Sequence, residues 1–108
     1  MKRIFAIVVG AVALAACISM DQIEPGLDAL VGKPLSTATS VLGFPGGERN
    51  TAGMHLVLWG HTDGPTACSI TLLVDAAQIV RGYQYDGNPA GCAAYIQRLN
   101  AYRKGAPS

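Results

Sequence analysis

Two histidines and a neighbouring aspartate are the residues whose types and spacing could do chemistry. His55, His61 and Asp63 could be ligands of one metal ion, or a general base and the carboxylate that orients it. The histidines lie on or beside one apolar run expected to form a strand, where six positions span about 20 Å. Zinc ligand bonds are near ~2 Å, so a shared metal would require a bend at Gly60. The sequence therefore predicts no metal and no cofactor, with a ligand or metal site near His55 and His61 as the alternative.

Other catalytic patterns are weak. The serines have no Gly-x-Ser-x-Gly context, which a nucleophile elbow requires. The glycine-rich piece at residues 43–47 lacks the terminal Lys-Ser/Thr and the following helix of a phosphate-binding loop, so it is interpreted as a turn. No set supplies nucleophile, base and stabiliser together, and the prediction is that this protein is not an enzyme.

The N-terminal segment has the pattern of a targeting signal. Lys2 and Arg3 precede residues 4–14, which carry no charge and no proline, and the run Leu14-Ala15-Ala16-Cys17 follows. The apolar run is shorter than the about 20 residues of a spanning helix. This arrangement resembles a bacterial lipoprotein signal peptide with its lipobox. The resemblance implies that residues 1–16 are removed and that Cys17 carries the lipid; an ordinary secretory signal that leaves a free Cys17 thiol is the alternative.

The residues after Cys17 bear on the location. In lipoproteins of this kind, as known for enterobacteria, Asp after the lipidated cysteine favours retention in the inner membrane. Ile18 stands there, so the resemblance favours the periplasmic face of the outer membrane, with the inner membrane as the alternative. Residues 17–26 are predicted to be the lipidated N-terminus and an extended tether.

The charge of the processed chain is close to neutral. Loss of Lys2 and Arg3 leaves six of the eight basic residues against seven acidic ones, a net charge of −1. No dense basic patch remains to attract a phosphate backbone, so nucleic acid is not an expected partner.

The remaining cysteines follow from the lipid assignment. With Cys17 acylated, Cys68 and Cys92 are left as a pair in an oxidising compartment. A redox dithiol is usually spaced Cys-x-x-Cys, so a structural disulfide is favoured over redox or metal use. Closing a loop of about 25 residues stabilises a fold by roughly 3.5 kcal/mol in the chain-entropy model.

The elements that position these residues can be predicted from periodicity and turn signals. Two short helices at 27–31 and 37–42 precede the strands, and a helix at 90–103 follows them. The expected strands are 54–61, 68–75 and 79–86. The predicted fold is α+β: two short N-terminal helices, a three-stranded antiparallel meander and a C-terminal helix pinned by the disulfide. Residues 27–104 form the single small domain, and residues 105–108 form a frayed tail.

The order of these elements resembles a known group. The stretch Leu30-Val31-Gly32-Lys33-Pro34-Leu35, then Leu42-Gly43-Phe44-Pro45, then an apolar strand with Trp59, resembles the small outer-membrane lipoproteins of the SmpA/OmlA (BamE-like) type. The resemblance covers residues 28–86 and implies an accessory role in outer-membrane protein assembly. The two later cysteines and the C-terminal helix depart from that group's pattern.

The predicted function follows from the anchor and from a candidate contact surface. Aromatic side chains could form that surface, with a polar rim around them. Its members are Arg49, His55, Trp59, Arg81, Tyr83 and Tyr85. The sequence predicts a lipid-anchored interaction module that faces the periplasm and binds an envelope protein, in outer-membrane protein assembly or envelope maintenance.

Overall fold

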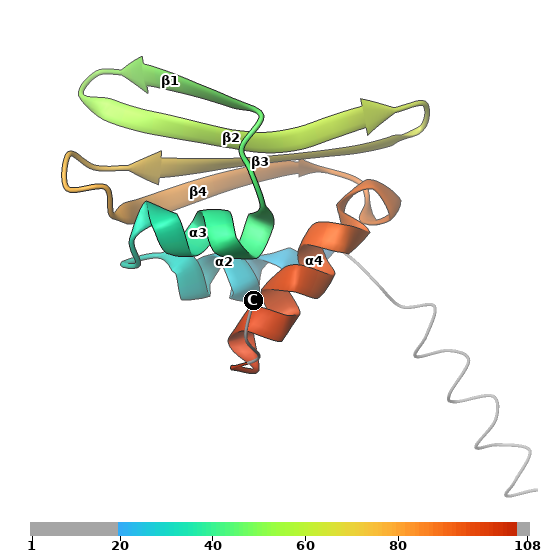
Figure 1. The fold of residues 1–108 in the computed structure, drawn as a ribbon. Helices are drawn as coiled ribbons and strands as arrows, with labels where there is room; N and C mark the ends of the chain where they lie inside the picture. Colours follow the sequence, from blue (N-terminus) through green and yellow to red (C-terminus); the bar gives the residue numbers. More distant parts are fainter. Residues whose placement is uncertain (1–19, 106–108) are drawn as a thin grey trace, which may run out of the picture.

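Four antiparallel strands form one sheet, and the helices pack against one of its faces (Figure 1). The computed structural model describes residues 20–105, so Cys17 and the predicted signal and most of the predicted tail lie outside the described part. In chain order the elements are η1 (Met20–Gln22), α2 (Ile23–Leu30), α3 (Leu35–Leu42), β1 (Gly47–Thr51), β2 (Met54–Asp63), β3 (Thr66–Val74), β4 (Val80–Gly87) and α4 (Pro89–Arg103).

The strands are joined as consecutive hairpins in the order β1-β2-β3-β4. The α+β class, the antiparallel sheet and the C-terminal helix agree with the prediction, whereas three strands were too few. The strand that the sequence did not indicate is β1, which has the residues Gly-Glu-Arg-Asn-Thr and is exposed along its whole length. It pairs with β2 from Gly47 opposite Leu58 to Thr51 opposite Met54. Backbone hydrogen bonds therefore hold a strand that buries no side chain.

The helical part begins earlier than predicted. Residues 17–26 were expected to be an extended tether, but Met20–Gln22 form a 3-10 turn and α2 starts at Ile23. Ile23 is fully buried and Gly26 is also inside. Pro25 is tolerated because it lies in the first turn of α2, where a helix has no use for its missing N–H. The tether prediction is thus wrong for residues 20–26, which belong to the folded domain.

The core lies between the sheet and the helices. On β3 the side chains alternate, and Cys68, Ile70, Leu72 and Val74 are buried on the helical side. Cross-strand pairing places Val57 and Trp59 of β2 on the same face. The helices contribute the other half of the core, from Ile23, Leu27, Leu30, Ala38, Val41, Leu42, Ile96 and Leu99.

The start of α4 is held tightly against β3. Asn88 caps the helix by accepting a hydrogen bond from the Gly91 N–H at 2.8 Å, and Pro89 occupies the first turn. Gly91 packs directly on the Ala67 backbone. The predicted disulfide between Cys68 and Cys92 is present, with Cα atoms 5.0 Å apart. It confirms that the C-terminal helix is pinned to the sheet. None of the helices in residues 20–105 is both long and apolar enough to cross a membrane.

Candidate functional site

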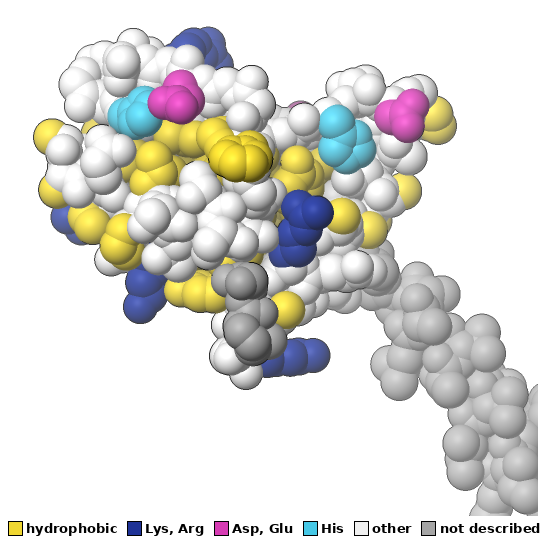
Figure 2. Space-filling model, in the orientation of Figure 1, with side chains coloured by type: hydrophobic (Ala, Val, Ile, Leu, Met, Phe, Trp, Pro, Cys, Tyr) yellow, Lys and Arg dark blue, Asp and Glu magenta, His cyan; other side chains and the backbone are white. Residues whose placement is uncertain are grey.

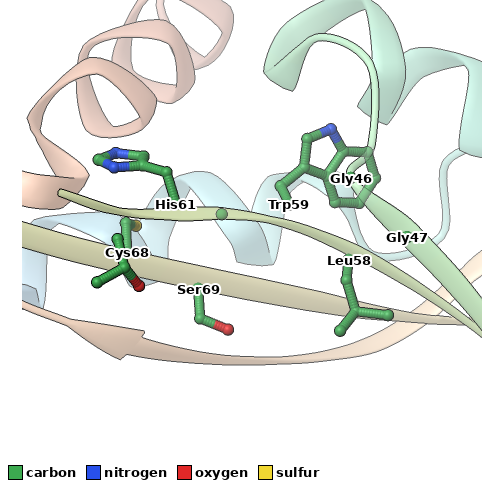
Figure 3. A pocket seen from close by; sticks show the side chains of 9 residues that line it. Gly46, Gly47, Leu58, Trp59, His61, Cys68 and Ser69 are labelled. Atoms are coloured by element: carbon green, nitrogen blue, oxygen red, sulfur yellow. The ribbon is translucent and has the colours of Figure 1, made fainter.

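The face of the sheet that points away from the helices has no covering layer among the described residues (Figure 1). Its rows follow from the register: Arg49, Leu56 and Leu73 lie side by side, and Leu58 and Thr71 lie in the next row. Figure 3 shows Leu58 and Ser69 pointing to this side while Trp59 and His61 point to the helical side. We call this surface the outer face, and its apolar members, Met54, Leu56, Leu58 and Leu73, are all half-buried.

The residues predicted to form one contact surface are divided between different places. Arg49 belongs to the outer face, opposite Leu56. Trp59 is 2% exposed and is a core residue, so its predicted place on a contact surface is wrong. Tyr83 and Tyr85 pair with Leu72 and Ile70 and therefore point to the helical side.

The two tyrosines join β4 to α2. The Tyr83 hydroxyl donates to Asp28 Oδ1 at 2.5 Å, and the Tyr85 hydroxyl donates to a carboxylate oxygen of Glu24. Their rings are stacked, with centres 6.4 Å apart. The hydrogen bond to Asp28 raises the pKa of Tyr83 to about 12, and the hydrogen bond to Glu24 raises the pKa of Tyr85 to about 12. These side chains clamp the first helix to the edge of the sheet.

The raised phenol pKa values predict a loss of stability in alkali. Both pKa values are higher in the folded state than their ordinary 10.0, so their contribution is complete below pH 10 and is lost as the pH rises through about 12. The double variant Tyr83→Phe/Tyr85→Phe should show a smaller fall of the urea midpoint over this pH range. Tyr102→Phe, on α4, is the control and should behave like the wild type. An equal fall of the urea midpoint in all three proteins would contradict a stabilising role for the hydrogen bonds of Tyr83 and Tyr85.

Arg81 and Asp75 organise the turn between β3 and β4. Asp75 Oδ1 accepts from the backbone N–H groups of Ala77 and Ile79 at 2.9 and 3.0 Å, and Arg81 Nε donates to Oδ2 at 2.6 Å. The Ile79 N–H and then the Arg81 side chain lower the pKa of the Asp75 carboxyl. This arrangement occupies Arg81 in a structural turn rather than on a contact surface.

The two histidines do not converge. His55 Nε2 donates to Glu48 Oε1 at 2.7 Å, and His61 Nε2 donates to the Gly91 carbonyl oxygen at 3.0 Å. Figure 2 shows the two histidine side chains at separate places on the surface. Within residues 20–105, no three side chains of the His, Cys, Asp or Glu type are grouped to hold a metal ion. Each histidine instead bonds to a neighbouring element.

A gap lies beside the second half of β2. The β1 pairing stops at Leu58, although β2 continues to Asp63 (Figure 1). The pocket at this place has a volume of about 350 Å³. Its lining is Gly46, Gly47, Leu58, Trp59, Gly60, His61, Thr62, Cys68 and Ser69 (Figure 3). Three glycines in this lining leave the strand edge accessible.

The loop between α3 and β1 exposes an aromatic side chain two residues before the first residue of the pocket lining, Gly46. Phe44 is 98% exposed, although both residues before it are held in place. Trp59 Nε1 donates to the Gly43 carbonyl at 2.8 Å, and Arg98 Nη1 donates to the Leu42 carbonyl at 3.1 Å. The sequence predicts only a turn at this loop, because an exposed Phe cannot be distinguished from a buried one by its type.

No protein-family model, no curated protein and no solved structure matches this chain.

Proposed function

We propose that this protein is a lipid-anchored interaction module of the bacterial envelope, which binds an envelope protein through the outer face of its sheet. The supporting observation is that helices cover one face of the sheet while the other keeps Met54, Leu56, Leu58 and Leu73 half-buried without a covering layer. Arg49 adds a charged residue at the rim of these apolar side chains. An apolar centre with a polar rim is the usual anatomy of a protein interface.

The proposed anchor determines how the outer face would be oriented relative to the membrane. Met20 packs against the core, and η1 contacts α2 and α4, so the chain enters the domain through its helical layer. Three residue steps from Cys17 to Met20 reach at most about 11 Å. A lipid on Cys17 would therefore keep the helical layer next to the membrane, and the outer face would point into the periplasm.

A ligand or metal site near His55 and His61 has less support. Both imidazoles already donate hydrogen bonds to groups of the fold, to Glu48 and to the Gly91 carbonyl. The resemblance to the SmpA/OmlA (BamE-like) lipoproteins supports a place in outer-membrane protein assembly.

The anchor is tested by Cys17→Ser. The variant should incorporate no labelled palmitate, because it lacks the sulfur atom that would carry the lipid. It would thereby lose acyl chains that contribute about 0.8 kcal/mol per buried methylene. Incorporation is measured in growing cells, with the Cys68→Ala/Cys92→Ala chain as the control that keeps Cys17. Retained label in Cys17→Ser would rule out this attachment site.

The outer face is tested by photo-crosslinking in intact cells. A photoreactive amino acid at Leu58, on the outer face, should form an adduct with a barrel-assembly protein. The same amino acid at Ala94, exposed on α4, is the matched control and should give none. Adducts from Ala94 alone would place the contact on the helical side and contradict the proposal.

A further inference from the structure

The second half of β2 is an unpaired strand edge. The Leu58 carbonyl accepts the Gly46 N–H at 2.7 Å, so the backbone groups of Leu58 point toward β1. Backbone direction alternates along an antiparallel strand, and Gly60 and Thr62 therefore point their N–H and C=O groups to the same side. In the part of the chain that the structure describes, no strand pairs with β2 on that side beyond Leu58.

This edge differs from the other strand edges in its side chains. Charged residues commonly protect free edges, and β1 has Glu48 and Arg49 while β4 has Arg81 and Asp86. The open stretch Gly60-His61-Thr62 has no carboxylate, lysine or arginine, and the first acidic residue is Asp63 at its end. A side chain at Gly60 would approach the Cys68 carbonyl to 2.3 Å, so the sheet itself requires glycine at the start of the edge.

The geometry points to a second copy of this chain as the occupant of the edge, paired antiparallel through residues 61–63 of both copies. With Thr62 opposite Thr62 of the second copy, His61 lies opposite Asp63 of the other strand, twice. A pairing centred on His61 would instead place two imidazoles face to face. The first register is therefore self-complementary, because each imidazole then lies opposite a carboxylate and not opposite another imidazole.

The gap has room for the second copy. In this register the Gly64-Pro65 turn of the second copy reaches the position opposite Gly60, where Gly46 and Gly47 line the pocket of about 350 Å³.

The twofold symmetry of this dimer would allow both copies to be anchored in the same membrane. Identical antiparallel strands in one sheet are related by a twofold axis perpendicular to that sheet. Both helical layers then lie on the same side, and so do the two chain entries at Met20. This agreement rests on the proposed function, whereas the strand pairing does not require the lipid.

Disulfide crosslinking of the full chain tests the register. In Thr62→Cys the two new cysteines would have Cα atoms about 5.5 Å apart, within the roughly 4.4–6.8 Å of a disulfide. Mild oxidation should give a dimer on a non-reducing gel at about tenfold the level of Thr51→Cys. Thr51 is a matched control, because it is an exposed strand threonine at the far end of β1. Equal dimer in both variants, or an adduct of another mass, would overturn the second copy as the occupant.

A proline variant tests the pairing without a new thiol. The Thr62 N–H faces the open edge, so Thr62→Pro removes a donor needed only between copies. In detergent, light scattering should give twice the chain mass for the wild type and the single chain mass for Thr62→Pro. Circular dichroism and an unchanged thiol count show that the variant is folded. A monomeric wild type would overturn the inference, while Leu58 crosslinking to an envelope protein would still support the proposed function.

Discussion

Replacing both Cys68 and Cys92 with alanine should lower the free energy of unfolding by about 3.5 kcal/mol, the chain-entropy value for a loop of this length. The bond joins the buried face of β3 to the first turn of α4, 24 positions away in the chain. A domain of this size has a total stability of roughly 5–10 kcal/mol, so the variant should lose a large share of its resistance to denaturant. Without the bond, positions 68 and 92 are no longer joined in the unfolded chain, which gains conformational entropy.

Urea unfolding followed by circular dichroism measures this effect. The wild type treated with a reductant is the matched control and should approach the double variant. Thiol counting on the unreduced, unfolded wild type should find neither Cys68 nor Cys92 free. A midpoint unchanged by both treatments would show that the bond contributes little to stability.

Gly91→Ala should destabilise the domain by about 3 kcal/mol, at the upper end of the usual cost of overpacking. In an exposed helix the same change would stabilise, since alanine is the better helix former by about 1 kcal/mol. Here the added Cβ would lie 2.2 Å from the Ala67 carbonyl oxygen and 2.5 Å from two other Ala67 backbone atoms. Backbone cannot rotate away as a side chain can, so α4 must shift from β3.

Gly82→Ala is the control for this prediction. Gly82 lies in β4, and an added Cβ there meets nothing within 4 Å. Its urea midpoint should stay close to that of the wild type while that of Gly91→Ala falls. Equal midpoints in the two variants would show that α4 adapts to the added methyl group.

The buried strands could be predicted because their side chains carry the signal. Residues 68–74 alternate apolar and polar, and β3 has that alternation in its burial. β1 could not be predicted in this way, since all five of its residues are exposed. The turn between β1 and β2 could not be predicted either. Ala52 and Gly53 both have positive φ, 50° and 81°, but the pair is not the Asn-Gly that is typical of such hairpins.

The contact residues were harder to assign than the strands. β2 is apolar on both faces, with Val57 and Trp59 inside and Leu56 and Leu58 outside. Only the register with β3 decides which pair is buried, and register is a long-range property. Tyr83 and Tyr85 illustrate the same limit, because their partners Asp28 and Glu24 lie 55 and 61 positions away.

The early start of α2 has a mechanical consequence. Few residues separate Cys17 from Ile23, whose side chain is fully buried, so tension between a lipid on Cys17 and a partner on the outer face would load the core directly. The load would reach the Glu24 bond to Tyr85 before the Asp28 bond to Tyr83. Bonds loaded one after another yield at lower force than bonds loaded together, so under such tension α2 would separate from β4 one hydrogen bond at a time.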